Sequence, residues 1–179
     1  MNTGSPGMSQ KTGRRIVGVA DMAISSTPGD TIITHALGSC LGIIVYDPVV
    51  KVGGLLHVML PQSSIDPAKA ASNPSMFVDT GVPRLFKECY KLGAKKEKMI
   101  IKVAGGAAIN ENPGRDGEAG GGDFFKIGKR NFVMLRKLLW KNGVLIEAHD
   151  VGSNISRTLQ VEIATGAVTV SSRGNKTSL

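Results

Sequence analysis

The chain has 179 residues, with 22 Lys and Arg against 14 Asp and Glu, and a formal net charge of +8. This length suits one domain with its own apolar core. The first residues, MNTGSPGMSQKTGRR, carry no apolar stretch after their charges. They predict a disordered tail over residues 1–13 and not a secretory signal. No uncharged apolar run approaches the length of a membrane span. We therefore expect a cytoplasmic protein without membrane insertion.

The positive charge is compatible with nucleic acid, a membrane surface or an acidic protein as partner. Aromatic residues make up only 4% of the chain, and the pattern contains no stacking platform for bases. This argues against nucleic-acid binding. Two stretches, 84–102 and 115–141, carry much of the excess positive charge. We expect them to form solvated helix faces, and the next interpretation is a surface for an acidic protein.

Short β-branched runs separated by turn residues predict most of the strands. In chain order they cover residues 14–25 (one strand or a pair), 31–37, 40–47, 55–60, 98–106, 144–152, 157–163 and 167–172. Apolar residues at helical spacing predict helices over 73–92 and 125–143. A glycine-rich loop is expected over 110–123. Many strands with two main helices favour an α+β fold with antiparallel or mixed sheets. The expected domain covers 14–174, followed by a flexible C-terminus at 175–179.

Cys40 follows a Gly-Ser step in LGSCLGIIVYD, and His57 lies seventeen residues later in GGLLHVMLP. A four-residue turn at 47–50 would place Cys40 directly opposite His57 in an antiparallel hairpin. A thiol beside an imidazole is the minimum equipment for nucleophilic cysteine chemistry. A reactive thiolate with a lowered pKa would support that interpretation. The alternative is a small, buried, inert cysteine.

The preceding strand offers Thr34, whose hydroxyl could accept a hydrogen bond from the second ring nitrogen of the histidine. His35 should point to the opposite face of that strand, whereas spacing leaves His149 open. Gly38 and Ser39 permit a turn whose backbone N–H groups could hold an oxyanion, although Gly38 could equally serve the turn alone.

Cys89 lies on the apolar stripe of the first expected helix and is predicted to belong to the core. Three scattered histidines and two cysteines lack the paired spacing of a metal site. The glycine-rich loop lacks the GxxxxGK[ST] spacing of a phosphate loop. We expect neither a metal nor a cofactor.

The two motifs around Cys40 and His57 resemble those of the CheD family of chemoreceptor glutamine deamidases. Further segments with the same resemblance follow in the family's order: VAGGAAI, IGKRNFVMLRKLL, HDVGSNISR and TGAVTV. The resemblance implies a cysteine hydrolase that converts glutamines of methyl-accepting chemotaxis receptors to glutamate, with release of ammonia. It places the nucleophile on Cys40, the histidine on His57 and the family's threonine on Thr34. It also implies a layered sandwich related to glutamine-deamidating toxin domains.

The resemblance further implies binding to a CheC-type phosphatase and, in some members, receptor methylesterase activity. The alternative to the enzyme is a non-catalytic module that binds a partner and regulates such a phosphatase. Two departures from the family pattern bear on partner or substrate selection. Ser153 stands where a second glycine is expected in DVGSN, and the loop over 110–123 is longer and richer in glycine than usual.

Overall fold

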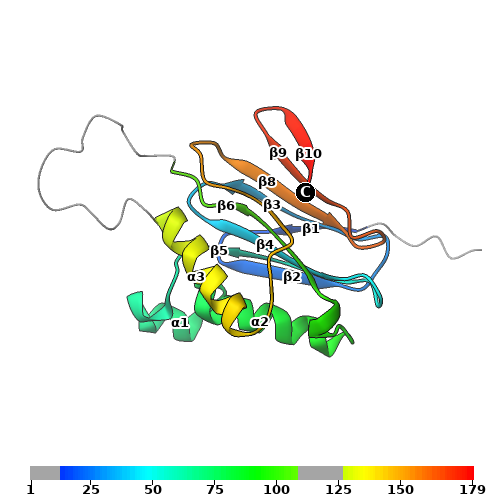
Figure 1. Ribbon diagram of the computed structural model, residues 1–179, viewed down its shortest axis with the longest axis horizontal. Helices are drawn as coiled ribbons and strands as arrows, with labels where there is room; N and C mark the ends of the chain where they lie inside the picture. The colour runs from blue at the N-terminus through cyan, green and yellow to red at the C-terminus, as the bar shows by residue number, and fades with distance from the viewer. Residues whose placement is uncertain (1–12, 109–126) are drawn as a thin grey trace, which may run out of the picture.

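Two β-sheets of five strands each dominate the computed structural model, which describes residues 13–108 and 127–179 (Figure 1). The first sheet has the order β1-β3-β8-β9-β10, and its strands are β1 (Arg14–Val17), β3 (Thr31–Leu37), β8 (Arg157–Glu162), β9 (Val168–Ser172) and β10 (Asn175–Ser178). The second has the order β2-β5-β4-β6-β7, and its strands are β2 (Asp21–Ser25), β5 (Val52–Val58), β4 (Leu41–Asp47), β6 (Ile100–Gly105) and β7 (Ala148–Val151).

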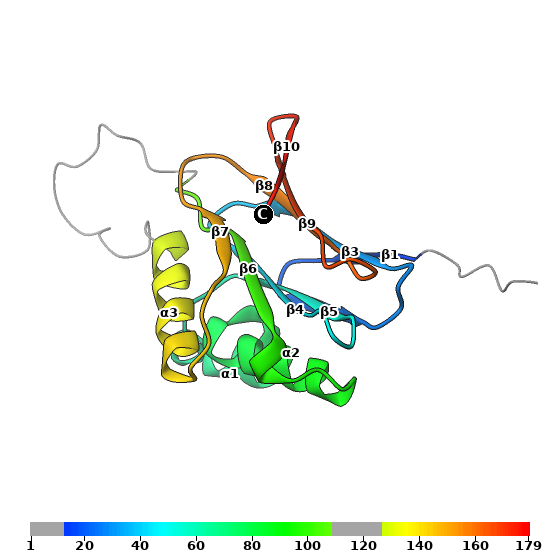
Figure 2. The ribbon, with the colours of Figure 1, turned by 45° about the vertical axis from the view of Figure 1, so that its right-hand side comes forward.

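The second sheet is the middle layer of the molecule. One of its faces packs on the first sheet, and the other is covered by α2 (Val78–Lys91) and α3 (Ile127–Lys141) (Figure 2). The short α1 (Pro67–Ser72) buries no side chain and contacts the 3₁₀ turns on either side of it. Two apolar clusters fill these interfaces: Ile44, Leu55 and Leu159 lie between the sheets, whereas other core residues lie beneath the helices. The expected α+β sandwich with mixed sheets is confirmed, while its likeness to toxin domains stays a prediction. None of the helices in the described ranges is long and apolar enough to cross a membrane.

Strands β4 and β5 form the centre of the middle layer, and every residue of both strands is buried. This explains their nearly continuous apolar sequences, because a strand covered on both faces gains nothing from alternation. Their register differs from the expected one by two positions. His57 pairs with Gly42 and not with Cys40, because the turn is wider than predicted and the ladder closes at Asp47 and Val52.

Several strand ends are shifted, and β7 begins only at Ala148 instead of 144. The other differences concern whole segments. Residues 14–25 were predicted to form one strand or a pair. They form two strands, β1 and β2, which belong to different sheets. The first long helix begins at Val78, later than expected, and a separate short helix precedes it. Pro83 lies inside that helix and does not begin it. Residues 175–178, expected to be flexible, pair with β9 and extend the sheet beyond residue 174. Residues 1–12 of the expected tail over 1–13, and the whole loop over 110–123, lie outside the described residues.

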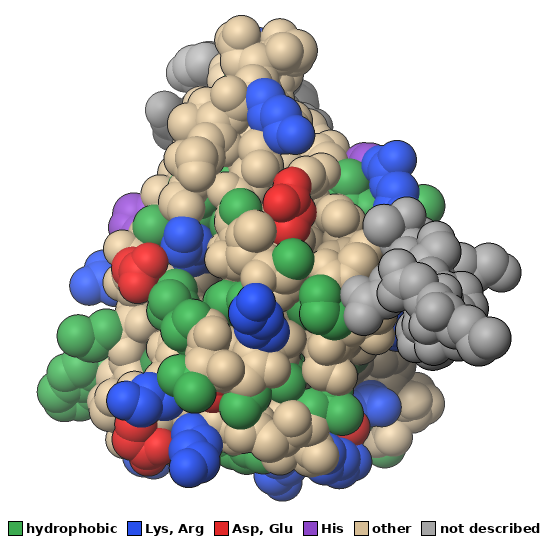
Figure 3. All heavy atoms as spheres, turned by 90° about the vertical axis from the view of Figure 1, so that its right-hand side faces the viewer, with side chains coloured by type: hydrophobic (Ala, Val, Ile, Leu, Met, Phe, Trp, Pro, Cys, Tyr) green, Lys and Arg blue, Asp and Glu red, His purple; other side chains and the backbone are tan. Residues whose placement is uncertain are grey.

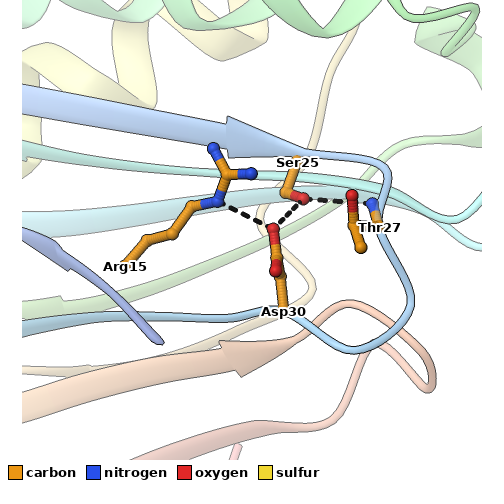
Figure 4. A network of polar contacts seen from close by, with 4 residues as sticks. All are labelled: Arg15, Ser25, Thr27 and Asp30. Atoms are coloured by element: carbon orange, nitrogen blue, oxygen red, sulfur yellow. Dashed lines mark hydrogen bonds and ion pairs between the residues drawn. The ribbon is translucent and has the colours of Figure 1, made fainter. Parts of the chain in front are cut away.

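A buried carboxylate joins the two sheets at one end (Figure 4). Arg15 in β1 donates its Nε hydrogen to Asp30 over 2.7 Å, and the Ser25 hydroxyl at the end of β2 donates to the same oxygen. Asp30 is only 5% exposed. The hydrogen bond from Ser25, helped by Arg15 and opposed by burial, holds the pKa of Asp30 below its usual value.

We expect Asp30→Ala to lower the free energy of unfolding by about 2–3 kcal/mol at pH 7, because two hydrogen bonds to a charged group are lost. Since the carboxylate has a lowered pKa when folded, this stabilisation is present above the unfolded pKa of about 3.9 and disappears as the pH falls through the folded value. Urea denaturation measures both effects. Glu88→Ala, which removes an exposed pair with Lys91, is the control and should change stability by less than about 0.5 kcal/mol. Equal effects of the two substitutions would contradict this role of Asp30.

Candidate active site

Cys40 ends the short loop between β3 and β4. Its side chain is half-buried and packs against the cluster between the two sheets. The β4–β5 ladder has Leu41 and Val58 as its last pair at this end, and Cys40 lies just outside it. The thiol therefore stands at the end of the hairpin, on its inter-sheet face.

His57 lies on the same face of the hairpin, in the middle layer. It pairs with Gly42, two residues after Cys40, so the cysteine and the histidine are diagonal neighbours rather than direct partners. Diagonal positions are about 7–8 Å apart at the backbone and within reach of long side chains. Gly42 places no side chain between them. The imidazole is only 1% exposed.

Thr34 reaches His57 from the opposite sheet. The Thr34 Oγ1 lies 2.7 Å from His57 Nδ1 and donates its own hydrogen to the Val17 carbonyl over 2.8 Å. Because the hydroxyl hydrogen is already used, the oxygen must accept from Nδ1–H. The neutral ring therefore carries its hydrogen on Nδ1 and leaves a lone pair on Nε2. Nε2 is buried and has no hydrogen-bond partner within the described residues.

Three other polar side chains near this hairpin do not orient the imidazole. Asp21 pairs with His57 from β2, yet its carboxylate is exposed and accepts from the N–H of Met22. His35 is exposed beside Thr158, on the face opposite Thr34 as expected. His149, which spacing left open, packs edge-on against Phe132 on the helix side of the sheet.

Burial keeps both members of the thiol–imidazole pair uncharged. It lowers the pKa of His57 to about 4 and raises the pKa of Cys40 above its ordinary value, although the backbone N–H of Cys40 itself favours the thiolate. Thr34 accepts from Nδ1–H whether the ring is neutral or charged, so this hydrogen bond does not counteract the lowering of the His57 pKa by burial. A preformed thiolate–imidazolium pair would require a lowered thiol pKa. The thiol pKa of Cys40 is raised instead, so the pair is neutral at rest. Near pH 7 the imidazole is therefore neutral, and Nε2 keeps a free lone pair.

The second cysteine has no place in the site. Cys89 is fully buried in α2, as predicted for a core residue, and burial raises its pKa to about 12.

The loop over residues 38–40, here called the cysteine loop, has three backbone carbonyls, and each accepts a hydrogen bond. Those of Gly38 and Cys40 accept from the N–H groups of Ala107 and Gly106, each over 2.8 Å. Gly38 uses its own N–H for the Ala36 carbonyl, so it supports the turn and cannot donate to an oxyanion. The left-handed conformation in this region falls on Ala36, with φ of 57°, and not on Gly38.

Asn131 in α3 holds the third carbonyl and was missed by the sequence analysis. Its Nδ2 donates to the carbonyls of Ser39 and Met59 over 3.1 and 2.9 Å, and the residue is fully buried. One signal was available: Asn131 falls on the buried stripe of α3 that also holds Gly128 and Leu135. A polar residue at such a position needs partners in the interior.

We expect ring-nitrogen NMR at pH 7 to show His57 protonated at Nδ1. Thr34→Val keeps the side-chain shape but removes the acceptor, so the ring should shift toward the Nε2–H form. Thr34→Ser retains the hydroxyl and should retain the Nδ1–H form. An unchanged tautomer in Thr34→Val would show that Thr34 does not set it.

The depressed pKa of His57 also predicts how stability depends on pH. The unfolded histidine takes up its proton near pH 6.5 and the folded one near pH 4, so the stabilisation is complete above 6.5 and lost as the pH falls to 4. Its size is about 3 kcal/mol, from about 1.4 kcal/mol per pKa unit. Denaturation of wild type and His57→Gln across this range should show the extra loss in wild type alone. Parallel curves would contradict the buried, neutral imidazole.

The comparisons with known proteins agree on one family. The profile described as "CheD chemotactic sensory transduction" matches residues 59–172, a range that begins just after His57. A protein of Syntrophus aciditrophicus named probable chemoreceptor glutamine deamidase CheD 1 is 53% identical over 89% of this chain and 94% of its own length. Similarly named proteins of Solibacter usitatus and Pyrococcus abyssi are 43% identical (92% of each chain) and 40% identical (85% of this chain, 87% of the relative). This chain belongs to the CheD family.

Proposed function

We propose that this protein hydrolyses the side-chain amide of chemoreceptor glutamines to glutamate, with Cys40 as nucleophile and His57 as base. The observation that carries the proposal is the hydrogen bond from His57 to Thr34, which leaves the lone pair of Nε2 unpaired on the inter-sheet face where Cys40 also lies. The names of the relatives supply the substrate class.

The first half of the reaction forms a thioester. Nε2 of His57 takes the thiol proton as Sγ of Cys40 attacks the carboxamide carbon, and the C=O electron pair moves onto oxygen. When the tetrahedral intermediate collapses, the C–N bond breaks and the imidazolium returns the proton to the departing nitrogen, which leaves as ammonia. Thr34 accepts from Nδ1–H throughout and holds the ring in place.

The second half releases glutamate. Nε2 takes a proton from water while the water oxygen bonds to the thioester carbon. The C–S bond then breaks, and the sulfur of Cys40 recovers the proton from the imidazolium. The net change is one water consumed and one ammonia released for each glutamine.

Backbone N–H groups of Ser39 and Cys40 supply the oxyanion contacts in this proposal. The N–H of Cys40 also lowers the pKa of its own thiol, although burial has the larger and opposite effect. Gly38, whose N–H is occupied, is limited to supporting the turn. Each oxyanion donor contributes about 10²–10³ in turnover in comparable enzymes.

The charge of the protein suits a substrate helix rich in carboxylates. The excess of basic residues gives a net charge of +8. Lys and Arg side chains are spread over the face in Figure 3, with Asp and Glu side chains among them. Such a surface attracts an acidic protein without one concentrated basic patch on that face. Receptor glutamines on cytoplasmic helices would place the protein in the cytoplasm.

The alternative is a non-catalytic regulator that binds a CheC-type phosphatase. Binding to that phosphatase stays a prediction that follows from the family resemblance, and it is compatible with either function. The pairing of Thr34 with His57 favours the enzyme, because a module that only binds would not need a buried imidazole with a vacant, oriented nitrogen.

Incubation with the cytoplasmic fragment of a chemoreceptor tests the proposal. Each target glutamine should gain about one mass unit by mass spectrometry, and about two more in water labelled with oxygen-18, because the new oxygen comes from water. Cys40→Ala should abolish the gain. Cys89→Ala, which removes the other thiol, is the matched control and should retain it. A mass gain that persists in Cys40→Ala, or none with wild type, would contradict the proposal.

A further inference from the structure

The amide of Asn131 bridges two backbone segments at the reactive end of the hairpin. Its two Nδ2 hydrogens go to Ser39, which precedes Cys40, and to Met59, which follows the last pair of the β4–β5 ladder. Asn131 therefore continues the cross-strand connection where the ladder itself stops. Two carbonyl acceptors around one atom require that atom to be the amino group, which fixes the orientation of the amide.

The carbonyl of Ser39 belongs to the same peptide unit as the N–H of Cys40. A trans peptide is planar, and its C=O and N–H point in opposite directions. A donor that holds the carbonyl of Ser39 therefore fixes the direction of the N–H of Cys40. The preceding unit is held in the same way, because the N–H of Ala107 binds the carbonyl of Gly38 and so directs the N–H of Ser39.

From this geometry we infer that Asn131 is a positioning residue that keeps the Cys40 N–H directed at the oxyanion. The inference rests on the proposed amide hydrolysis and adds a residue from α3 to it. Among the described residues, the hydrogen bonds of the Asn131 side chain go to backbone carbonyls alone and not to the thiol or the imidazole. It acts through the Ser39–Cys40 peptide, which could otherwise turn its carbonyl toward the substrate.

The geometry predicts a specific pattern of kinetic effects. Without Asn131 the Ser39–Cys40 peptide loses a donor, and the oxyanion loses a preorganised N–H. Turnover should fall by about 10²–10³, because this contact forms fully only in the transition state. The KM for the receptor fragment should change by less than about threefold, because Asn131 makes no contact that binds the substrate and the transition state equally.

Alkylation by iodoacetamide separates this role from a general effect on the site. In that reaction the sulfur of Cys40 bonds to the methylene carbon and iodide leaves, so no oxyanion forms. The rate depends mainly on how strongly burial holds the proton on sulfur, because the N–H of Cys40 has the smaller effect on the thiol pKa. Asn131→Ala should alkylate at Cys40 within about threefold of the wild-type rate at the same pH, while its deamidation turnover falls by about 10²–10³.

Leu135→Ala is the matched control for stability. Leu135 is fully buried on the same face of α3, one turn further along. Its apolar side chain cannot donate a hydrogen bond to the cysteine loop. Its truncation should lower stability by about 2–5 kcal/mol and leave turnover per folded molecule within about threefold. If Asn131→Ala does not fold, Asn131→Leu replaces the amide by an apolar group of the same branched shape, removes both amide donors and should show the same selective loss.

The experiment measures ammonia release from the receptor fragment, alkylation rate and stability for wild type and these variants. A selective loss of turnover in the Asn131 variants supports the inference. Turnover that stays near wild type in folded Asn131→Ala overturns it, and so does a parallel fall in alkylation, which would place the effect on the thiol. Absence of deamidation by wild type is a different result, because it removes the proposed function and the inference with it.

Discussion

The hydrogen bond between Thr34 and His57 depends on the packing of one sheet against the other. Thr34 belongs to β3 in the first sheet, and His57 to β5 in the second. The bond forms only when both inner faces meet in the correct register. Any shift of β3 by one residue would turn Thr34 outward and His35 inward. The apolar contacts between the sheets thus do more than stabilise the fold, because they determine which ring nitrogen of His57 carries the hydrogen.

Close approach of two backbones sets the position of the thiol. A side-chain carbon on Gly105 would lie only 2.2 Å from the carbonyl oxygen of Cys40, and its φ of 112° is also rarely adopted by other residues. Gly128 at the start of α3 meets Gly106 in a similar way, with 2.5 Å to the carbonyl oxygen. These glycines allow β6 and α3 to reach the cysteine loop and supply the donors that hold it. The motifs VAGG and IGKRN therefore act on the site although they contain none of the reacting atoms.

The sequence predicted the strands of the hairpin, the α+β class and the buried state of Cys89, because these follow from local patterns of apolar residues. It placed Cys40 and His57 near each other but erred by two positions in register, since the length of the turn decides the register and Lys51 adopts a left-handed conformation in it. It could not show that Thr34 approaches from the other sheet, because strand order is a property of the whole chain. Asn131 lies 92 positions from Ser39, and no local pattern links the two.

Burial gives this site a thiol and an imidazole that are both neutral at rest. A preformed ion pair would make Cys40 reactive toward any electrophile, whereas the raised thiol pKa and the lowered imidazole pKa keep the proton on sulfur. In the proposed reaction, proton transfer becomes favourable only when a carbonyl carbon is in place to receive the sulfur and an oriented N–H is ready for the oxygen. The chemistry then depends on preorganised backbone donors more than on an activated thiolate. This is why a buried asparagine that binds only backbone carbonyls can matter as much to turnover as a residue in contact with the substrate.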